Sequence, residues 1–114
     1  MSNDLAHVLD MLRSAEAIAG FVAGLSEQTF LNDIEKQSAV LYQFVVLGEA
    51  ANRVSKEFEE AHPELTWSRV VAFRNIILHQ YHAVDLDIVW EIVSNELPKT
   101  IEALKQLAPT NPNG

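Results

Sequence analysis

The stretch AVLYQFVVLGEAANRV, from Ala39 to Val54, decides how this chain folds. Its apolar residues fall on nearly every face of a helix, and they are interrupted only by Gln43, Gly48, Glu49, Asn52 and Arg53. A helix that is apolar all round is buried all round. In a chain with so few helices, we expect this helix either to lie at the centre of the fold or to have its far side covered by a second subunit.

Apolar residues at three- and four-residue steps predict one helix that contains this stretch and further helices before and after it. The predicted helices cover residues 3–25, residues 32 or 33 to 60, residues from about 66 through the following apolar run, and residues 85–107. No strand alternation and no internal repeat is visible. The sequence therefore predicts an all-α fold, an up-and-down bundle of four main helices. We expect one domain over residues 1–107 and a disordered tail over residues 108–114.

Turn signals set the expected helix ends. Gly24 ends the first helix, and Ser26 begins one further short turn. His62-Pro63 ends the second helix, and Thr66 and Asp85 are candidate N-caps. Pro98 lies inside the last apolar stripe and removes a backbone donor, so it predicts a kink about one turn earlier, near residues 94–95.

Composition restricts the classes of function. The chain has 114 residues, 48% of them hydrophobic, no cysteine and a formal net charge of −8. The missing thiols exclude disulfides and thiolate metal sites, and they favour a cytoplasmic protein. The first twenty residues carry three acidic side chains, so we expect neither a signal peptide nor a membrane span. The acidic balance argues against broad electrostatic binding of nucleic acid.

Gly48 and Glu49 stand out inside the second predicted helix. A glycine in a helix interior costs roughly 0.5–1 kcal/mol relative to alanine, so Gly48 suggests a close contact between helices. Glu49 beside it is a candidate partner for a buried arginine or histidine. A structural ion pair is a better interpretation of Glu49 than a catalytic carboxylate, because structural networks also perturb carboxylates.

A second notable stretch is WSRVVAFRNIILHQYH, from Trp67 to His82. It places five polar side chains in an apolar run: Arg74, Asn75, His79, Tyr81 and His82. Such groups either satisfy one another or line a cleft, because burial without partners costs on the order of 1–3 kcal/mol each. On an ideal helix Asn75 and His79 lie about 40° apart, whereas Arg74 and His79 lie about 140° apart. Either the helix ends before His79, or a second copy of the chain completes the site across a two-fold axis.

These residue types suit cleavage of RNA by its own 2′-hydroxyl. An imidazole such as that of His79 can accept or donate a proton near neutral pH. The guanidinium of Arg74 binds phosphate oxygens and keeps its charge. Asn75 can orient the imidazole or contact the phosphate. The reaction requires no cofactor and no metal.

Plainer interpretations of the same residues stay open. Without the rest of the set, Arg74 on an apolar helix is more often an ion-paired structural residue, with Glu49 as its partner. Tyr42, Trp67 and Trp90 are expected to pack in the core or at an interface. His79 and His82 have a spacing that could chelate a metal, but two ligands make an incomplete site.

Arg74-Asn75, three residues, and then His79, Gln80 and Tyr81 resemble the R-X4-H-X-Y motif of HepT-type toxins, a branch of the HEPN-domain ribonucleases. Other parts of the chain are similar to that branch as well: Gly48-Glu49-Ala50-Ala51, Pro63, Trp67, Asp85, Trp90 and Leu97-Pro98. The resemblance covers nearly everything from Leu5 to Leu107. Arg and His at this spacing alone are a weak signal, and the ordered set is a much stronger one.

The resemblance implies an all-helical homodimer and a metal-independent endoribonuclease toxin, with Arg74 and His79 catalytic. We expect Asn75 and Glu49 to support these two residues. It also implies a minimal nucleotidyltransferase partner as antitoxin, which in the family can transfer AMP to the motif tyrosine, here Tyr81. The alternative hypothesis is a non-catalytic helical subunit that partners the nucleotidyltransferase and uses the same cleft to bind a nucleotide or phosphate. The intact motif favours the enzyme, and the charge of −8 favours the binding subunit.

Overall fold

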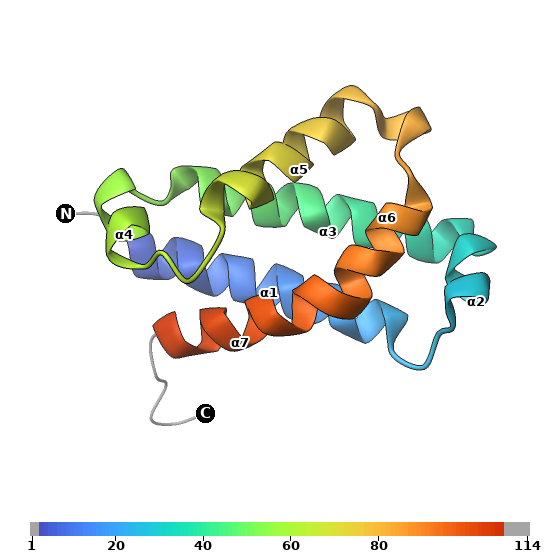
Figure 1. The fold of residues 1–114 in the computed structure, drawn as a ribbon, viewed down its shortest axis with the longest axis horizontal. Helices are drawn as coiled ribbons and strands as arrows, with labels where there is room; N and C mark the ends of the chain where they lie inside the picture. Colours follow the sequence, from blue (N-terminus) through green and yellow to red (C-terminus); the bar gives the residue numbers. More distant parts are fainter. Residues whose placement is uncertain (1–2, 109–114) are drawn as a thin grey trace.

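The computed structural model describes residues 3–108, and within that range every regular element is helical. The bundle has four long arms: α1 (Asp4–Val22), α3 (Ile34–Arg53), α5 (Trp67–His79), and a last arm made of α6 (Leu86–Glu91), the π-helical turn η2 (Ile92–Glu96) and α7 (Leu97–Leu107). Figure 1 shows α1 and α3 running along the long axis, with α5 slanting above α3 and α7 below α1. The predicted all-α four-helix bundle is confirmed. The predicted tail lies outside the described residues from residue 109 onward.

The core forms where the apolar stripe of α1 meets α3 and α7. Val8, Met11, Ala15 and Ile18 recur at three- and four-residue steps and are fully buried, as is Leu104 of α7. Burying a side chain as large as that of Met11, Ile18 or Leu104 contributes roughly 1.5–3 kcal/mol. The apolar residues whose spacing predicted the helices therefore also stabilise the packing between them. No helix within residues 3–108 has both the length and the apolar content needed to cross a bilayer.

The turn between α1 and α3 contains the short helix α2 (Glu27–Leu31), which confirms the turn predicted at Ser26. Ser26 caps it, since its Oγ accepts a hydrogen bond from the Thr29 backbone N–H at 3.1 Å. Gly24 has a φ of +79°, a left-handed conformation that glycine adopts without a steric penalty. Phe30 of α2 is fully buried, with its ring centroid 5.3 Å from that of Trp90. This contact closes one end of the bundle.

The prediction of one long helix reaching Glu60 was wrong. The central helix α3 ends at Arg53, and a separate helix, α4 (Lys56–Ala61), follows. Ser55 makes the break: its Oγ accepts a hydrogen bond from the Phe58 N–H at 3.1 Å and so caps α4. Its backbone N–H and hydroxyl both donate to the buried carboxylate of Asp4, at 2.8 and 2.7 Å. A contact 51 residues apart in sequence therefore outweighs local helix propensity.

The kink predicted near residues 94–95 is confirmed. The turn η2 has π-helical hydrogen bonding, and Figure 1 shows the helical arm changing direction between α6 and α7. Pro98 is the second residue of α7, where its missing N–H costs little. The irregular turn lies just before the proline, where the sequence placed it.

One side of α3 is left open by the single chain. Tyr42 is 65% exposed, and Val45 and Val46 beside it are only half-buried. Of the three aromatic residues expected to pack, Trp67 is buried and Trp90 is partly buried, but Tyr42 is outside the core. The all-round burial predicted for this helix is thus incomplete within one chain.

Candidate active site

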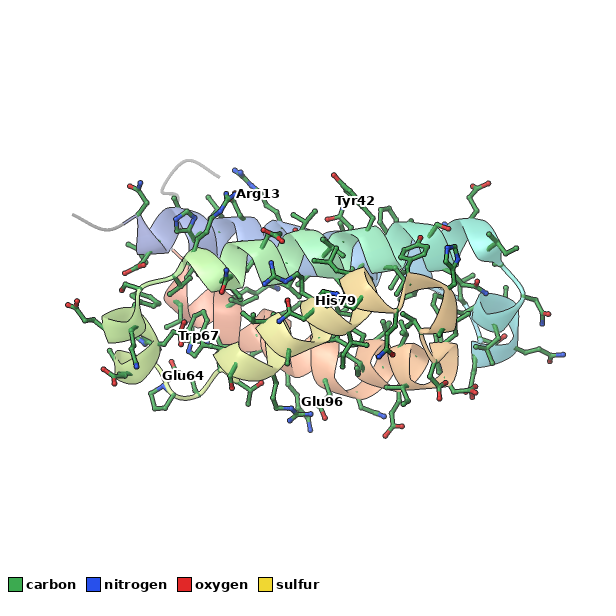
Figure 2. All side chains as sticks on the ribbon, turned by 90° about the horizontal axis from the view of Figure 1, so that it is seen from above. Arg13, Tyr42, Glu64, Trp67, His79 and Glu96 are labelled. Carbon is green, nitrogen blue, oxygen red and sulfur yellow. The ribbon has the colours of Figure 1, made fainter. Side chains whose placement is uncertain are left out.

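The helix α5 carries the motif and is anchored at its first residue. Trp67 is buried, and its indole Nε1 donates a hydrogen bond to the His62 carbonyl oxygen at 2.9 Å. Thr66 occupies the predicted N-cap position, but its side chain makes no capping hydrogen bond. From Trp67 the helix continues to His79, and Figure 2 shows these two residues at its opposite ends.

Arg74 points into the contact between α5 and α3, and its side chain is only 11% exposed. Its Nη1 donates a hydrogen bond to Oε1 of Glu49, with which it forms an ion pair. The structure thus shows the pairing predicted for Glu49, whose own side chain is 44% exposed. The Nε of Arg74 is buried and has no hydrogen-bond partner among the described residues. Orphaned donors of this kind are rare and often belong to functional groups or bind solvent.

Gly48 makes room for Arg74. A Cβ built on Gly48 would lie 2.2 Å from Cβ and 2.6 Å from Cγ of Arg74, far inside van der Waals contact. It would also lie 3.4 Å from the Val70 carbonyl oxygen. These are near-backbone atoms that cannot swing away, so any larger residue would push α3 and α5 apart. The close helix contact inferred from this glycine is confirmed.

His79 is the last residue of α5, and its side chain is exposed. The helix ends because the N–H of Gln80 closes the final turn on the Ile76 carbonyl oxygen at 2.8 Å and the chain then changes direction. Asn75, one turn earlier, is exposed as well. The helix does not end before His79, so the first explanation for the angular offset is excluded. Arg74 is paired with Glu49 on the α3 side of the helix, whereas the His79 side chain is exposed, and no hydrogen bond within residues 3–108 joins the two.

Tyr81 lies outside α5, in the 3₁₀ turn η1 (Tyr81–Ala83). Its side chain is 47% exposed, and its ring stands perpendicular to that of His82 at 5.9 Å. Seven residues of continuous helix would bring Tyr81 back to the face of Arg74, but α5 ends at His79. Within residues 3–108, no group of three or more His, Asp or Glu side chains is placed to hold a metal ion.

A groove beside the motif was not foreseen from the sequence. It has a volume of about 300 Å³ and lies between α5, α3 and the η2–α7 arm. Its lining is mostly apolar, and the polar side chains in it are Thr66, Arg69, Glu96 and Thr100. They form two pairs, Thr66 with Arg69 at the start of α5 and Glu96 with Thr100 on the η2–α7 arm, and nothing in the sequence links one pair to the other. Only the folded chain shows that they share one hollow.

Residues 11–107 match the family described as Ribonuclease HepT-like. The chain belongs to this family. Among HepT-like relatives, a protein of Methanocaldococcus jannaschii named "Putative RNase" is 31% identical over 94 residues, which is 82% of this chain and 86% of the relative. A second "Putative RNase" of that organism is 28% identical over 102 residues, covering 90% of this chain and 84% of the relative.

A protein of Thermococcus cleftensis named "Probable ribonuclease HepT" is 29% identical over 89 residues, covering 78% of this chain and 81% of the relative. No solved structure matches the chain. Membership of the HepT-like family agrees with the all-helical fold and makes the chain an endoribonuclease by family. The resemblance stated from the motif residues is confirmed.

Proposed function

We propose that this HepT-like chain cleaves RNA without a metal ion, through Arg74 and His79, as the toxin of a toxin–antitoxin pair. The main support for the proposal is the arrangement of side chains on α5. This helix buries Arg74 against Glu49, and it exposes His79 and Asn75 to solvent. Family membership supplies the reaction class. The motif supplies a proton carrier and a permanent cation, the two groups that the reaction needs.

In the proposed reaction, the 2′-hydroxyl of one nucleotide attacks the adjacent phosphorus. The imidazole of His79 accepts the proton of that hydroxyl or donates one to the departing 5′-oxygen. Arg74 stabilises the charge that builds on the non-bridging oxygens. Asn75 supports the imidazole from one turn away, and Glu49 holds the guanidinium in one direction. The products are a 2′,3′-cyclic phosphate and a free 5′-hydroxyl.

The proposed assembly is a two-fold homodimer with the active cleft at the interface. Two observations support it: Arg74 and His79 diverge within one chain, and α3 leaves Tyr42, Val45 and Val46 partly uncovered. A two-fold axis pairs each such surface with its own copy. The motif helices then face each other, and each copy contributes its arginine and histidine to a shared cleft.

The proposed partner is a minimal nucleotidyltransferase antitoxin, which acts by docking, by transfer of AMP to Tyr81, or by both. The exposure of the Tyr81 side chain supports the second route, because a phenol that is to be modified must be reachable. An attached AMP would add bulk and negative charge beside the motif helix.

A non-catalytic nucleotide- or phosphate-binding subunit is the second candidate. It is favoured by the net charge of −8 and by the Glu49 carboxylate, which already neutralises the Arg74 guanidinium. In this alternative the same cleft binds a phosphate and performs no chemistry on it.

Cleavage in the presence of EDTA separates the two candidates. We expect the purified chain to cut RNA with EDTA present and to leave 2′,3′-cyclic phosphate ends. Arg74→Ala and His79→Ala should each lower the rate by about 10²–10⁴-fold, the usual loss for a positioned acid or base, while circular dichroism shows an intact fold. Cleavage that survives both substitutions, or that requires added metal, rules out this assignment. Binding of RNA without cleavage supports the second candidate.

A further inference from the structure

The groove between α5 and the η2–α7 arm lies close to the proposed reaction centre. Ile76 lines it, and His79 follows one turn later at the end of the same helix. Phe44 and Phe73 are also among its lining residues, with ring centroids 5.0 Å apart in an edge-to-face arrangement. A hollow of about 300 Å³ with such walls fits a flat apolar ring system.

The η2–α7 wall of the groove offers hydrogen-bond acceptors. Glu96 is exposed and forms no ion pair within residues 3–108. The hydroxyl of Thr100 donates to the Glu96 carbonyl oxygen at 3.1 Å, so its remaining capacity at the groove is to accept. Figure 2 shows Glu96 on the edge of the molecule opposite Tyr42, with His79 between them. This wall is therefore suited to a ligand edge that carries a donor.

The α5 wall offers a cation. Arg69 is exposed and, in the described part of the chain, has no carboxylate partner, whereas Arg74 is held by Glu49. Arg69, Ala72, Ile76 and His79 all lie on the exposed side of α5. Ten residues of helix separate Arg69 from His79, which is about 15 Å along the axis. Arg69 is therefore the free cation on the side of the helix that presents the imidazole.

We propose that this groove binds one nucleobase of the RNA substrate, next to the cleaved phosphate, and selects bases that carry an exocyclic amino group. Glu96 and Thr100 accept hydrogen bonds from that amino group, as carboxylates do from cytosine. Arg69 binds a flanking phosphate, and the apolar lining contacts the base faces. Cytosine, adenine and guanine carry the amino group, and uracil lacks it. The inference rests on the proposed function, because it takes RNA as the ligand.

Binding of uncleavable RNA tests the groove independently of catalysis. The probes are a labelled 2′-O-methyl uridine hexamer and the same hexamer with one cytidine or one adenosine at the centre. We expect the substituted hexamers to bind the wild-type protein about fivefold to tenfold more tightly. Glu96→Ala should reduce that preference to less than about twofold, since the acceptor is gone. Arg69→Gln should weaken all three hexamers alike and lower the salt slope of log K by about 0.7, the value for one phosphate on a single strand.

Matched controls lie elsewhere on the surface. Glu91→Ala and Lys99→Gln remove the same charges at exposed positions that do not line the groove, so neither should change affinity or preference. Equal binding of the three hexamers by wild-type protein, or a preference that survives Glu96→Ala, overturns the proposal. A change of oligomeric state in the groove variants by light scattering would instead make the groove a protein interface. RNA binding with the expected preference but no cleavage upholds the groove and refutes the proposed enzyme.

Discussion

Gly48 is the residue on which the position of Arg74 depends. We expect Gly48→Ala to lower both thermal stability and RNA cleavage, because the new methyl group falls 2.2 Å from Cβ of Arg74 and displaces the helix that carries it. Overpacking of this kind costs about 1–3 kcal/mol, which exceeds the roughly 0.5–1 kcal/mol that alanine gains in a helix. Thermal melts and cleavage rates measure the two effects.

Gly20 provides the matched control, since it lies in α1 and a Cβ built there meets no atom within 4 Å. Gly20→Ala should therefore raise stability by up to about 1 kcal/mol and leave cleavage unchanged. If the two substitutions have the same effect, the close approach of α3 and α5 does not position the arginine.

Tyr81 and Tyr42 give a test of the proposed modification, because both are exposed and only Tyr81 belongs to the motif. After co-expression with the cognate nucleotidyltransferase, intact-mass and peptide analysis should find one or more AMP units on Tyr81. Tyr81→Phe should carry none, and Tyr42→Phe should be modified as wild type is. The modified protein should no longer cleave RNA. AMP found on another residue, or full inhibition of an unmodified complex, would leave Tyr81 as an ordinary exposed tyrosine.

The junction of α3 and α4 depends on Ser55, which caps α4 and donates two hydrogen bonds to Asp4. Ser55→Ala keeps the backbone N–H but removes the cap and the hydroxyl donor. We expect a loss of about 1–3 kcal/mol, the sum of a lost cap and a lost bond to a buried carboxylate. Ser26→Ala, which removes an exposed cap of α2, should cost less. Urea denaturation compares the two, and equal losses would mean that the link to Asp4 adds nothing.

The helices and their apolar stripes follow from the sequence, because the three- and four-residue spacing of apolar side chains is a local property. The break after Arg53 does not follow from local sequence, because it depends on the carboxylate of Asp4, 51 residues away from Ser55. Gly48 and Glu49 could be linked to a buried arginine in advance, since a helix-interior glycine beside a carboxylate has few other uses. The groove could not be foreseen, because Arg69 and Glu96 line the same hollow only after α3, α5 and the η2–α7 arm have packed.

The whole molecule is predicted to act as a dimer through the open side of α3. A charged residue introduced on that side should therefore prevent dimer formation. We expect Tyr42→Asp to convert a homodimer into a monomer and to abolish RNA cleavage, because a buried carboxylate without a partner is strongly unfavourable at an interface. Ile88→Asp alters a similarly exposed apolar residue on α6 and should do neither. Light scattering at micromolar protein concentration measures the oligomeric state of each variant. A wild-type monomer that cleaves RNA refutes the shared cleft.

The π-helical turn η2 also restricts how the length of this chain can change. A π turn holds one more residue than an α turn, so the extra residue is absorbed at η2 and α7 keeps its phase relative to the core. Deleting a residue within η2, such as the exposed Asn95, should let α6 continue into α7 as regular helix, with Leu97 and Leu104 still in the core. Deleting a residue beyond the turn, such as the exposed Lys99, would instead rotate the rest of α7 by about 100° and take Leu104 out of the core. A single-codon deletion is therefore tolerated at η2, whereas the same deletion in α7 would require a new apolar stripe.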